Sequence, residues 1–241
     1  MKPASKRTSI VAAVLAFVFG ASSCSYLMPN KITTSKILDY YEDSRYDEVD
    51  IDEIIDKYED LYYATEIDED LKNGVYTLAT SSNEIKSMFR DYDDLNLFQI
   101  FGMKYDKHME QACWFTRVEE SNNFNSINMI TVASIQFESS SDARDYVTDI
   151  SEYVEDVAED VESGDLEGYD DYEIDSGKEG FMGYVLIHYD LSNTDTDMYC
   201  GMYLQGRYLL VVIGADLDST KAKREIESIC DSFGILCPTS L

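Results

Sequence analysis

The chain has 241 residues, of which 48 are Asp or Glu and 19 are Lys or Arg, and its formal charge at pH 7 is −29. Nucleic-acid binding depends largely on basic side chains that neutralise phosphates, so this composition excludes nucleic acid as a partner. With 44% hydrophobic and 12% aromatic residues, the chain has enough apolar side chains to bury a sizeable core.

The beginning of the chain has the features of a secretory signal peptide. Three basic residues precede an apolar run at 10–19, and small residues follow at 20–23. The run is about half as long as the roughly 20 residues that a membrane-spanning helix needs. Removal of residues 1–23 would leave 16 basic and 48 acidic residues, for a formal charge of −32.

The stretch Ala21-Ser22-Ser23-Cys24 resembles the lipobox of bacterial lipoprotein precursors. The resemblance implies that signal peptidase cuts before Cys24 and that lipid on this cysteine anchors the mature protein to the cell membrane, outside the cytoplasm. Ala21 stands where leucine is usual, and its spacing from Ser23 also suits ordinary signal peptidase and simple secretion. The number of cysteines favours the lipobox. If lipid occupies Cys24, four of the five cysteines remain, an even number, whereas simple secretion leaves one thiol without a possible partner.

Three segments follow from this cleavage site. They are a signal peptide at 1–23, a short tether at 24–33 and an acidic extracytoplasmic domain at 34–241. An acidic, glycine-containing stretch near 163–178 is either a joint between two halves of the domain or a long loop before a strand.

The first part of the domain is mainly helical in pattern. Apolar residues at three- and four-residue steps predict helices at 34–41 and 51–62. A strand is predicted at 75–80, after which Ser81 and Glu84 form a capping box for a third helix.

The rest of the domain alternates strands with two further helices. Strands are predicted at 110–118, 128–137, 181–190, 197–204 and 207–215, and helices at 143–161 and 220–233. These elements predict an α+β fold, an antiparallel sheet with helices packed on one face. Strand–strand–helix occurs at 110–162 and again at 198–233, which indicates either an internal duplication or two copies of a common unit.

The motifs of well-known enzyme classes are absent from the sequence. His108 and His188 lie in no HExxH helix and in no cysteine–histidine cluster with zinc spacing. No nucleophile elbow, phosphate loop or S-x-x-K motif occurs. His188 is interpreted as a packed or hydrogen-bonded strand residue. We therefore expect a protein without catalytic activity, cofactor or dedicated metal site.

The many acidic residues leave two alternatives open. A pair of carboxylates could serve an envelope hydrolase, although 48 acids make such pairs frequent by chance. Acidic segments such as 50–56 and 171–177 offer oxygen ligands that suit calcium, but none has the glycine and glutamate of an EF-hand loop. The second alternative is thus a solute- or cation-binding lipoprotein.

The four cysteines that remain after lipidation are candidates for disulfide bonds, since export permits them. They are Cys113, Cys200, Cys230 and Cys237. Four cysteines allow three pairings, and the sequence does not choose among them or between bridges and free thiols. Cys230 and Cys237 are close enough in sequence for a local bridge.

Aromatic residues supply the remaining candidates for a site. Trp114, Tyr203 and Tyr208 could line a face that binds sugars or proteins, or they could be sheet residues packed under helices. The sequence therefore predicts a lipid-anchored, non-catalytic binding or interaction protein whose partner is an envelope protein or glycan. A lipobox followed by an acidic, tyrosine-rich α+β body is similar to many uncharacterised surface lipoproteins of Gram-positive bacteria, which implies a location more than a task.

Overall fold

The computed structural model describes residues 32–43, 46–63, 67–89, 98, 101–120, 127–166, 169–179, 182–191, 196–216 and 220–241. The strands are β1 (Asp47–Glu48), β2 (Val75–Ala79), β3 (Met109–Glu120), β4 (Ile127–Phe137), β5 (Tyr169–Glu179), β6 (Met182–Leu191), β7 (Thr196–Gln205) and β8 (Tyr208–Ala215). The helices are α2 (Thr34–Asp43), α3 (Ile51–Tyr63), α4 (Glu69–Asn73), α5 (Ser82–Met88), α6 (Ser140–Ser163), α7 (Thr220–Phe233) and the short 3-10 helix η3 (Pro238–Ser240).

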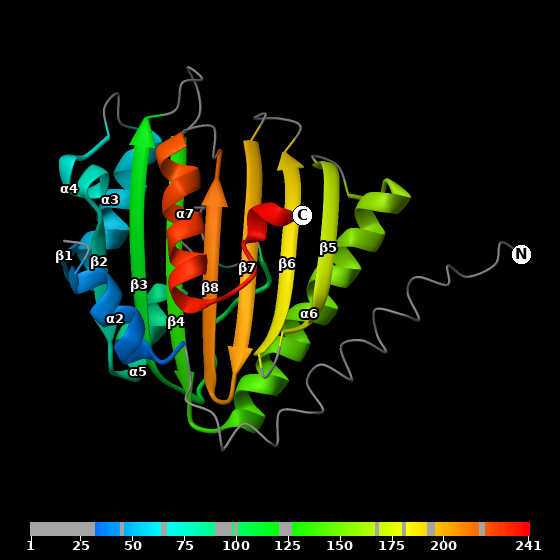
Figure 1. The fold of residues 1–241 in the computed structure, drawn as a ribbon, viewed down its shortest axis with the longest axis horizontal. Helices are drawn as coiled ribbons and strands as arrows, with labels where there is room; N and C mark the ends of the chain where they lie inside the picture. Colours follow the sequence, from blue (N-terminus) through cyan, green and yellow to red (C-terminus); the bar gives the residue numbers. More distant parts are fainter. Residues whose placement is uncertain are drawn as a thin grey trace, which may run out of the picture.

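The strands form one eight-stranded sheet in the order β1-β2-β3-β4-β8-β7-β6-β5 (Figure 1). The short edge strand β1 pairs in parallel with β2, and the other pairs are antiparallel. Helices pack against this sheet. The predicted α+β class with a mainly antiparallel sheet is therefore confirmed.

Apolar side chains fill a core on each face of the sheet. Face A is the side whose core includes residues of α3, α4, α5 and α6, and face B is the side whose core includes residues of α2 and α7. In β8, Leu209, Val211 and Ile213 point into face A, whereas Leu210 and Val212 point into face B. Figure 1 shows α7 in front of the sheet and α6 behind it.

The expectation that the helices cover a single face is thus corrected, because they cover both. The sequence carried a signal for this arrangement. The strand at 207–215 is an almost unbroken apolar run, which is typical of a strand buried on both sides, whereas a strand with one solvated face alternates apolar and polar residues.

Both predicted strand–strand–helix units are present, as β3-β4-α6 and β7-β8-α7. The strands β4 and β8 are antiparallel neighbours, so the rotation that exchanges the pair β3-β4 with the pair β8-β7 is a two-fold axis perpendicular to the sheet. Such a rotation would place the helices of the two units on the same face. Since α6 and α7 lie on opposite faces, this rotation does not superimpose the units. Their likeness is limited to the order of elements.

The acidic stretch after α6 contains an edge strand. Gly164 ends α6 with a left-handed φ of 77°, and β5 then pairs with β6 and extends the sheet. The sequence analysis did not predict this strand, because its many acidic residues obscure the alternation of apolar and polar residues that is typical of a strand. Charged residues are common on edge strands, where they discourage pairing with other chains.

The predicted capping box at the start of α5 is confirmed. The hydroxyl of Ser81 accepts a hydrogen bond from the backbone N–H of Glu84 at 3.3 Å, and the Glu84 carboxylate accepts one from the backbone N–H of Ser81 at 2.9 Å. The two residues therefore satisfy each other's backbone donors at the helix end.

Two substitutions test whether both faces carry a packed core. We expect Ile150→Ala in α6 and Ile226→Ala in α7 each to lower the free energy of unfolding by about 2–5 kcal/mol, because both side chains are buried, on opposite faces. Asp149→Ala, on the exposed side of α6, should change it by less than about 0.5 kcal/mol. Urea denaturation measures all three. An isoleucine variant as stable as the aspartate control would show that its helix is not packed on the sheet.

Candidate functional site

Two clusters in the described part of the chain each combine one histidine with two carboxylates, and in each the candidate ligand atoms lie within 4.8 Å of one another. The His108 cluster consists of His108, Glu138 and Asp142, and the His188 cluster consists of His188, Asp190 and Asp197. They lie at opposite ends of the sheet, since the first adjoins the end of β4 near the β7–β8 turn and the second adjoins the start of β7.

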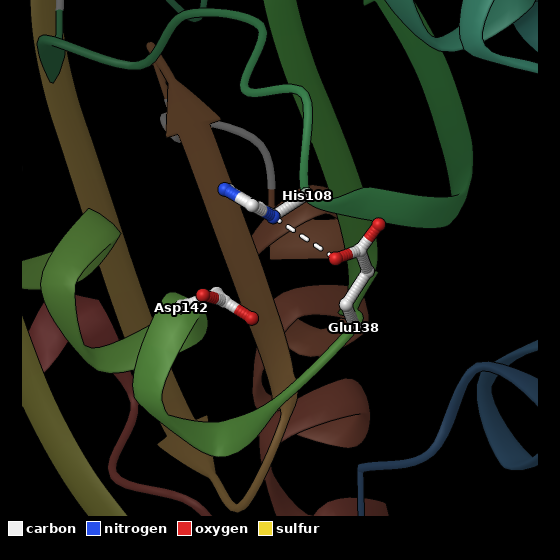
Figure 2. A group of neighbouring side chains, drawn as sticks. All are labelled: His108, Glu138 and Asp142. Atoms are coloured by element: carbon white, nitrogen blue, oxygen red, sulfur yellow. Dashed lines mark hydrogen bonds and ion pairs between the residues drawn. The ribbon is translucent and has the colours of Figure 1, made fainter.

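Backbone pairing holds His108 and Glu138 together in the first cluster. The backbone N–H of Glu138 donates to the carbonyl of His108 at 2.8 Å. Nδ1 of His108 lies 3.0 Å from Oε2 of Glu138, which is hydrogen-bonding distance (Figure 2). This bond raises the pKa of the His108 imidazole above its ordinary value.

Asp142, the third member, belongs to the cap of α6. The hydroxyl of Ser139 accepts hydrogen bonds from the backbone N–H groups of Ser141 and Asp142, each at 3.2 Å, and donates to the Asp142 carboxylate at 2.5 Å. The partial positive charge at a helix N-terminus favours a carboxylate here and disfavours a metal cation. The His108 cluster is therefore a helix cap beside an exposed ion pair.

The second cluster depends on the pairing of β6 with β7. The register places Asp190 opposite Asp197 and His188 opposite Tyr199. The His188 ring stacks on the Tyr199 ring, with a centroid distance of 4.5 Å and an interplanar angle of 15°. Burial, and then the charges of Asp197 and Asp190, raise the pKa of the Tyr199 phenol.

The polar atoms of this cluster are close together without ordinary hydrogen-bond spacing. Nε2 of His188 is buried, has no hydrogen-bond partner among the described residues, and lies 3.4 Å from Oδ1 of Asp190 and 3.8 Å from Oδ1 of Asp197. The His188 side chain is only 15% exposed, whereas those of Asp190 and Asp197 are 38% and 56% exposed. Oδ1 of Asp190, the oxygen nearest Nε2, is buried as well. The cluster is thus a buried imidazole nitrogen facing two carboxylates whose side chains are partly exposed.

Backbone contacts hold the start of β7 in place. The backbone N–H of Asp197 donates to Oδ1 of Asp216 at 3.2 Å, and the backbone N–H of Asp216 donates to the carbonyl of Asp197 at 2.9 Å. Asp216 adopts a left-handed φ of 47°, which is uncommon for a residue other than glycine. These contacts fix the backbone that carries the Asp197 carboxylate.

Two of the predicted disulfide candidates are far apart. Cys113 lies on face B of β3 and Cys200 on face A of β7, separated by three strand spacings, or about 14 Å. The Cα atoms of a disulfide are at most about 7 Å apart, so these two cysteines do not bridge. Burial raises the pKa of the Cys113 thiol to about 12 and that of Cys200 well above its ordinary value.

The other two candidates are in contact. Hydrogen bonds from Cys230 and then Thr239 lower the pKa of the Cys237 thiol to about 6, and the same contact with Cys237 raises the pKa of Cys230. Sγ of Cys237 lies 3.1 Å from Oγ1 of Thr239. All four described cysteines are free thiols in the structure. Cys230 and Cys237 are therefore the pair placed for a local bridge.

The aromatic candidates do not form one binding face. Trp114 is buried on face A, whereas Tyr203 is buried on face B, and Tyr208 packs against the face-B core. The Tyr203 hydroxyl donates to the carbonyl of Leu236, which follows α7. These residues belong to the packing of the sheet. Cys24, the remaining predicted site, lies outside the described residues.

Comparison of the chain with protein-family models, curated proteins and solved structures finds no match. The His188 cluster is the group that sequence reasoning missed. Its only sequence signal is a pair of short polar motifs, His188-Tyr189-Asp190 near the end of one strand and Asp197-Met198-Tyr199 near the start of the next. The signal becomes readable once the register of that hairpin is known.

The ion pair of His108 predicts a pH-dependent contribution to stability. Because the pKa of His108 is raised in the folded protein, pairing stabilises the fold below the unfolded-state pKa, about 6.5, and this effect is lost as pH rises through the folded pKa. The melting temperature of His108→Gln should therefore be lower than that of the wild type near pH 5. Near pH 8, which is about 1.5 units above the unfolded-state pKa, the two melting temperatures should be equal. Glu138→Gln should show the same profile, and a difference that does not vary with pH would contradict the pairing.

The contact of the two cysteines predicts selective reactivity. In native protein at pH 7 we expect iodoacetamide to modify Cys237 first, because its pKa of about 6 makes it a thiolate, whereas Cys113 and Cys200 are buried. Peptide mass spectrometry identifies the modified residue. Cys230→Ala should slow the reaction about tenfold by returning the Cys237 pKa toward that of a free thiol. Equal rates in wild type and variant would show that Cys230 does not activate Cys237.

Proposed function

We propose that this chain is a lipid-anchored, extracytoplasmic binding or interaction protein of the cell envelope without catalytic activity. The observation that carries the proposal is the lipobox-like stretch Ala21-Ser22-Ser23-Cys24, preceded by a basic end and a short apolar run. Two acyl chains on Cys24 would supply stable membrane binding, since each buried methylene contributes about 0.8 kcal/mol.

The start of the folded body supports a short tether. Ile32 is fully buried in the face-B core, and the hydroxyl of Thr34 lies 3.4 Å from that of Ser134 in β4. The eight residues from Cys24 to Ile32 reach at most about 28 Å when fully extended. A lipid on Cys24 would thus hold the body close to the bilayer. In the described part of the chain, every helix is too short or too polar to cross a membrane.

The position of the tether favours a binding end that faces away from the membrane. Ser134 pairs with Leu210, near the β7–β8 turn, whereas Asp197 lies at the opposite end of β7. Leu210 in turn pairs with Tyr203, six residues along β7 from Asp197, which is a distance of about 20 Å. The His188 cluster therefore lies at the end of the sheet remote from the point where the tether joins it.

The charge of the body supports attachment through lipid. The formal charge of −32 after removal of the signal peptide repels an anionic membrane surface. The same charge attracts cations and basic proteins, which makes these the ligand classes best suited to its surface.

Substitution of Cys24 tests the proposal. In a bacterium that expresses the full chain, Cys24→Ala should move the protein from the detergent-extracted membrane fraction to the soluble extracytoplasmic fraction, because no acyl chains are attached. Ser25→Ala, next to the cleavage site, should leave it in the membrane fraction. Mass spectrometry should find diacylglycerol on an N-terminal Cys24 in the control. A bare Cys24, or membrane retention of Cys24→Ala, would refute the anchor.

A further inference from the structure

We propose that His188, Asp190 and Asp197 form a binding site for a divalent transition-metal ion of the zinc type. The inference names a ligand for the proposed binding function and in that sense rests on it. The metal site itself depends only on the folded body and not on the lipid.

The spacing of the ligand atoms fits a tetrahedral metal ion. Zinc binds imidazole nitrogen and carboxylate oxygen at about 2.0–2.2 Å, so two ligand atoms at a tetrahedral angle are about 3.4 Å apart. Nε2 of His188 lies 3.4 Å from Oδ1 of Asp190 and 3.8 Å from Oδ1 of Asp197. A direct N–H···O hydrogen bond would bring one of these oxygens to about 2.9 Å. Both separations are longer than a direct hydrogen bond, the first equals the ligand–ligand distance of a zinc tetrahedron, and all three ligand atoms lie within 4.8 Å of one another.

The charges of the cluster also favour a cation. Asp190 and Asp197 occupy directly opposed positions on neighbouring strands, where like charges destabilise the sheet. The neighbours Tyr189 and Met198 are buried in face A, so the strands cannot slip to separate the carboxylates without exposing apolar side chains. A divalent ion between the carboxylates would offset their repulsion.

The ligand types favour zinc or cobalt over calcium and magnesium. Imidazole nitrogen suits zinc and related transition metals, whereas calcium and magnesium prefer all-oxygen sites. The stack on Tyr199 holds the ring of His188 in one orientation, which is the role that outer-shell groups have at metal sites. Three protein ligands leave a fourth position for water or for a donor group of a partner, and the Asp197 side chain, which is 56% exposed, lies where the cluster meets solvent.

The His108 cluster is the natural control because it has the same ligand types and a different arrangement. Its histidine is hydrogen-bonded to Glu138 at 3.0 Å, and its Asp142 is held by the cap of α6 at a helix N-terminus that disfavours cations. Metal binding that depended only on exposed histidine and carboxylate would occur equally at both clusters.

The test is zinc binding by the full chain, purified in detergent and stripped of metal with a chelator. Isothermal titration with zinc should give one site per chain, and cobalt at the same site should give the visible absorption of a tetrahedral ion. His188→Gln and Asp197→Asn should each weaken zinc binding at least about tenfold, as loss of a group at a metal site does. Asp197 is more than half exposed, so its substitution should leave the fold intact, which circular dichroism checks.

Two control variants test whether other groups in the chain bind the zinc. His108→Gln and Cys237→Ser should each leave zinc affinity unchanged. Loss of binding in either control would overturn the proposal in favour of the His108 cluster or the thiol pair. Weak binding of several ions that all variants retain would overturn it in favour of adventitious binding by surface acids. Absence of zinc binding in a chain that still carries lipid on Cys24 would refute this inference alone, without affecting the anchor.

Discussion

The register of the β6–β7 hairpin is the constraint on which the charged end of the sheet depends. Side chains alternate between the two faces, so a slip of one residue would turn Ile187 and Cys200 out of the face-A core and bring charged side chains into it. Packing of apolar side chains on face A therefore fixes which residues of β6 and β7 lie opposite one another on face B. Asp190 remains opposite Asp197 despite their repulsion, and His188 remains beside them.

Coverage of the sheet separates its structural part from its candidate binding part. The central strands β4 and β8 have buried side chains on both faces, with α6 on one side and α7 on the other. Beyond them, where β6 ends and β7 begins, the Asp190 and Asp197 side chains are 38% and 56% exposed, although Oδ1 of Asp190 is buried. Burial of the neighbouring apolar side chains fixes the backbone of this end, and that backbone carries the partly exposed polar side chains. A rigid scaffold with an accessible edge is the usual setting of a binding site.

The sequence contains most of the elements of this fold. Helical periodicity located α2, α3, α6 and α7, and the pair Ser81 and Glu84 located the start of α5. The continuous apolar run of β8 also implied burial on both faces, but without knowledge of the strand order it was assigned one covered face. The strand β5 was missed for a different reason, since its acidic residues resemble a loop when its partner β6 is not known.

The candidate site was less predictable because it depends on pairing across strands. The closeness of Cys230 and Cys237 could be predicted because they are only seven positions apart in the sequence, on either side of one turn. The aromatic residues Trp114 and Tyr203 appeared equivalent in the sequence, yet they lie on opposite faces of the sheet. His188 appeared to be an ordinary strand residue, because its relation to Asp197 exists only through the register of the hairpin.

The most direct test of a metal ion at this end of the sheet is a crystal structure of the zinc-loaded chain, with diffraction data collected at the zinc absorption edge. We predict one anomalous peak about 2.0–2.2 Å from Nε2 of His188 and from a carboxylate oxygen of each of Asp190 and Asp197. A strong peak at His108 or at Cys237, or none at His188, would contradict it.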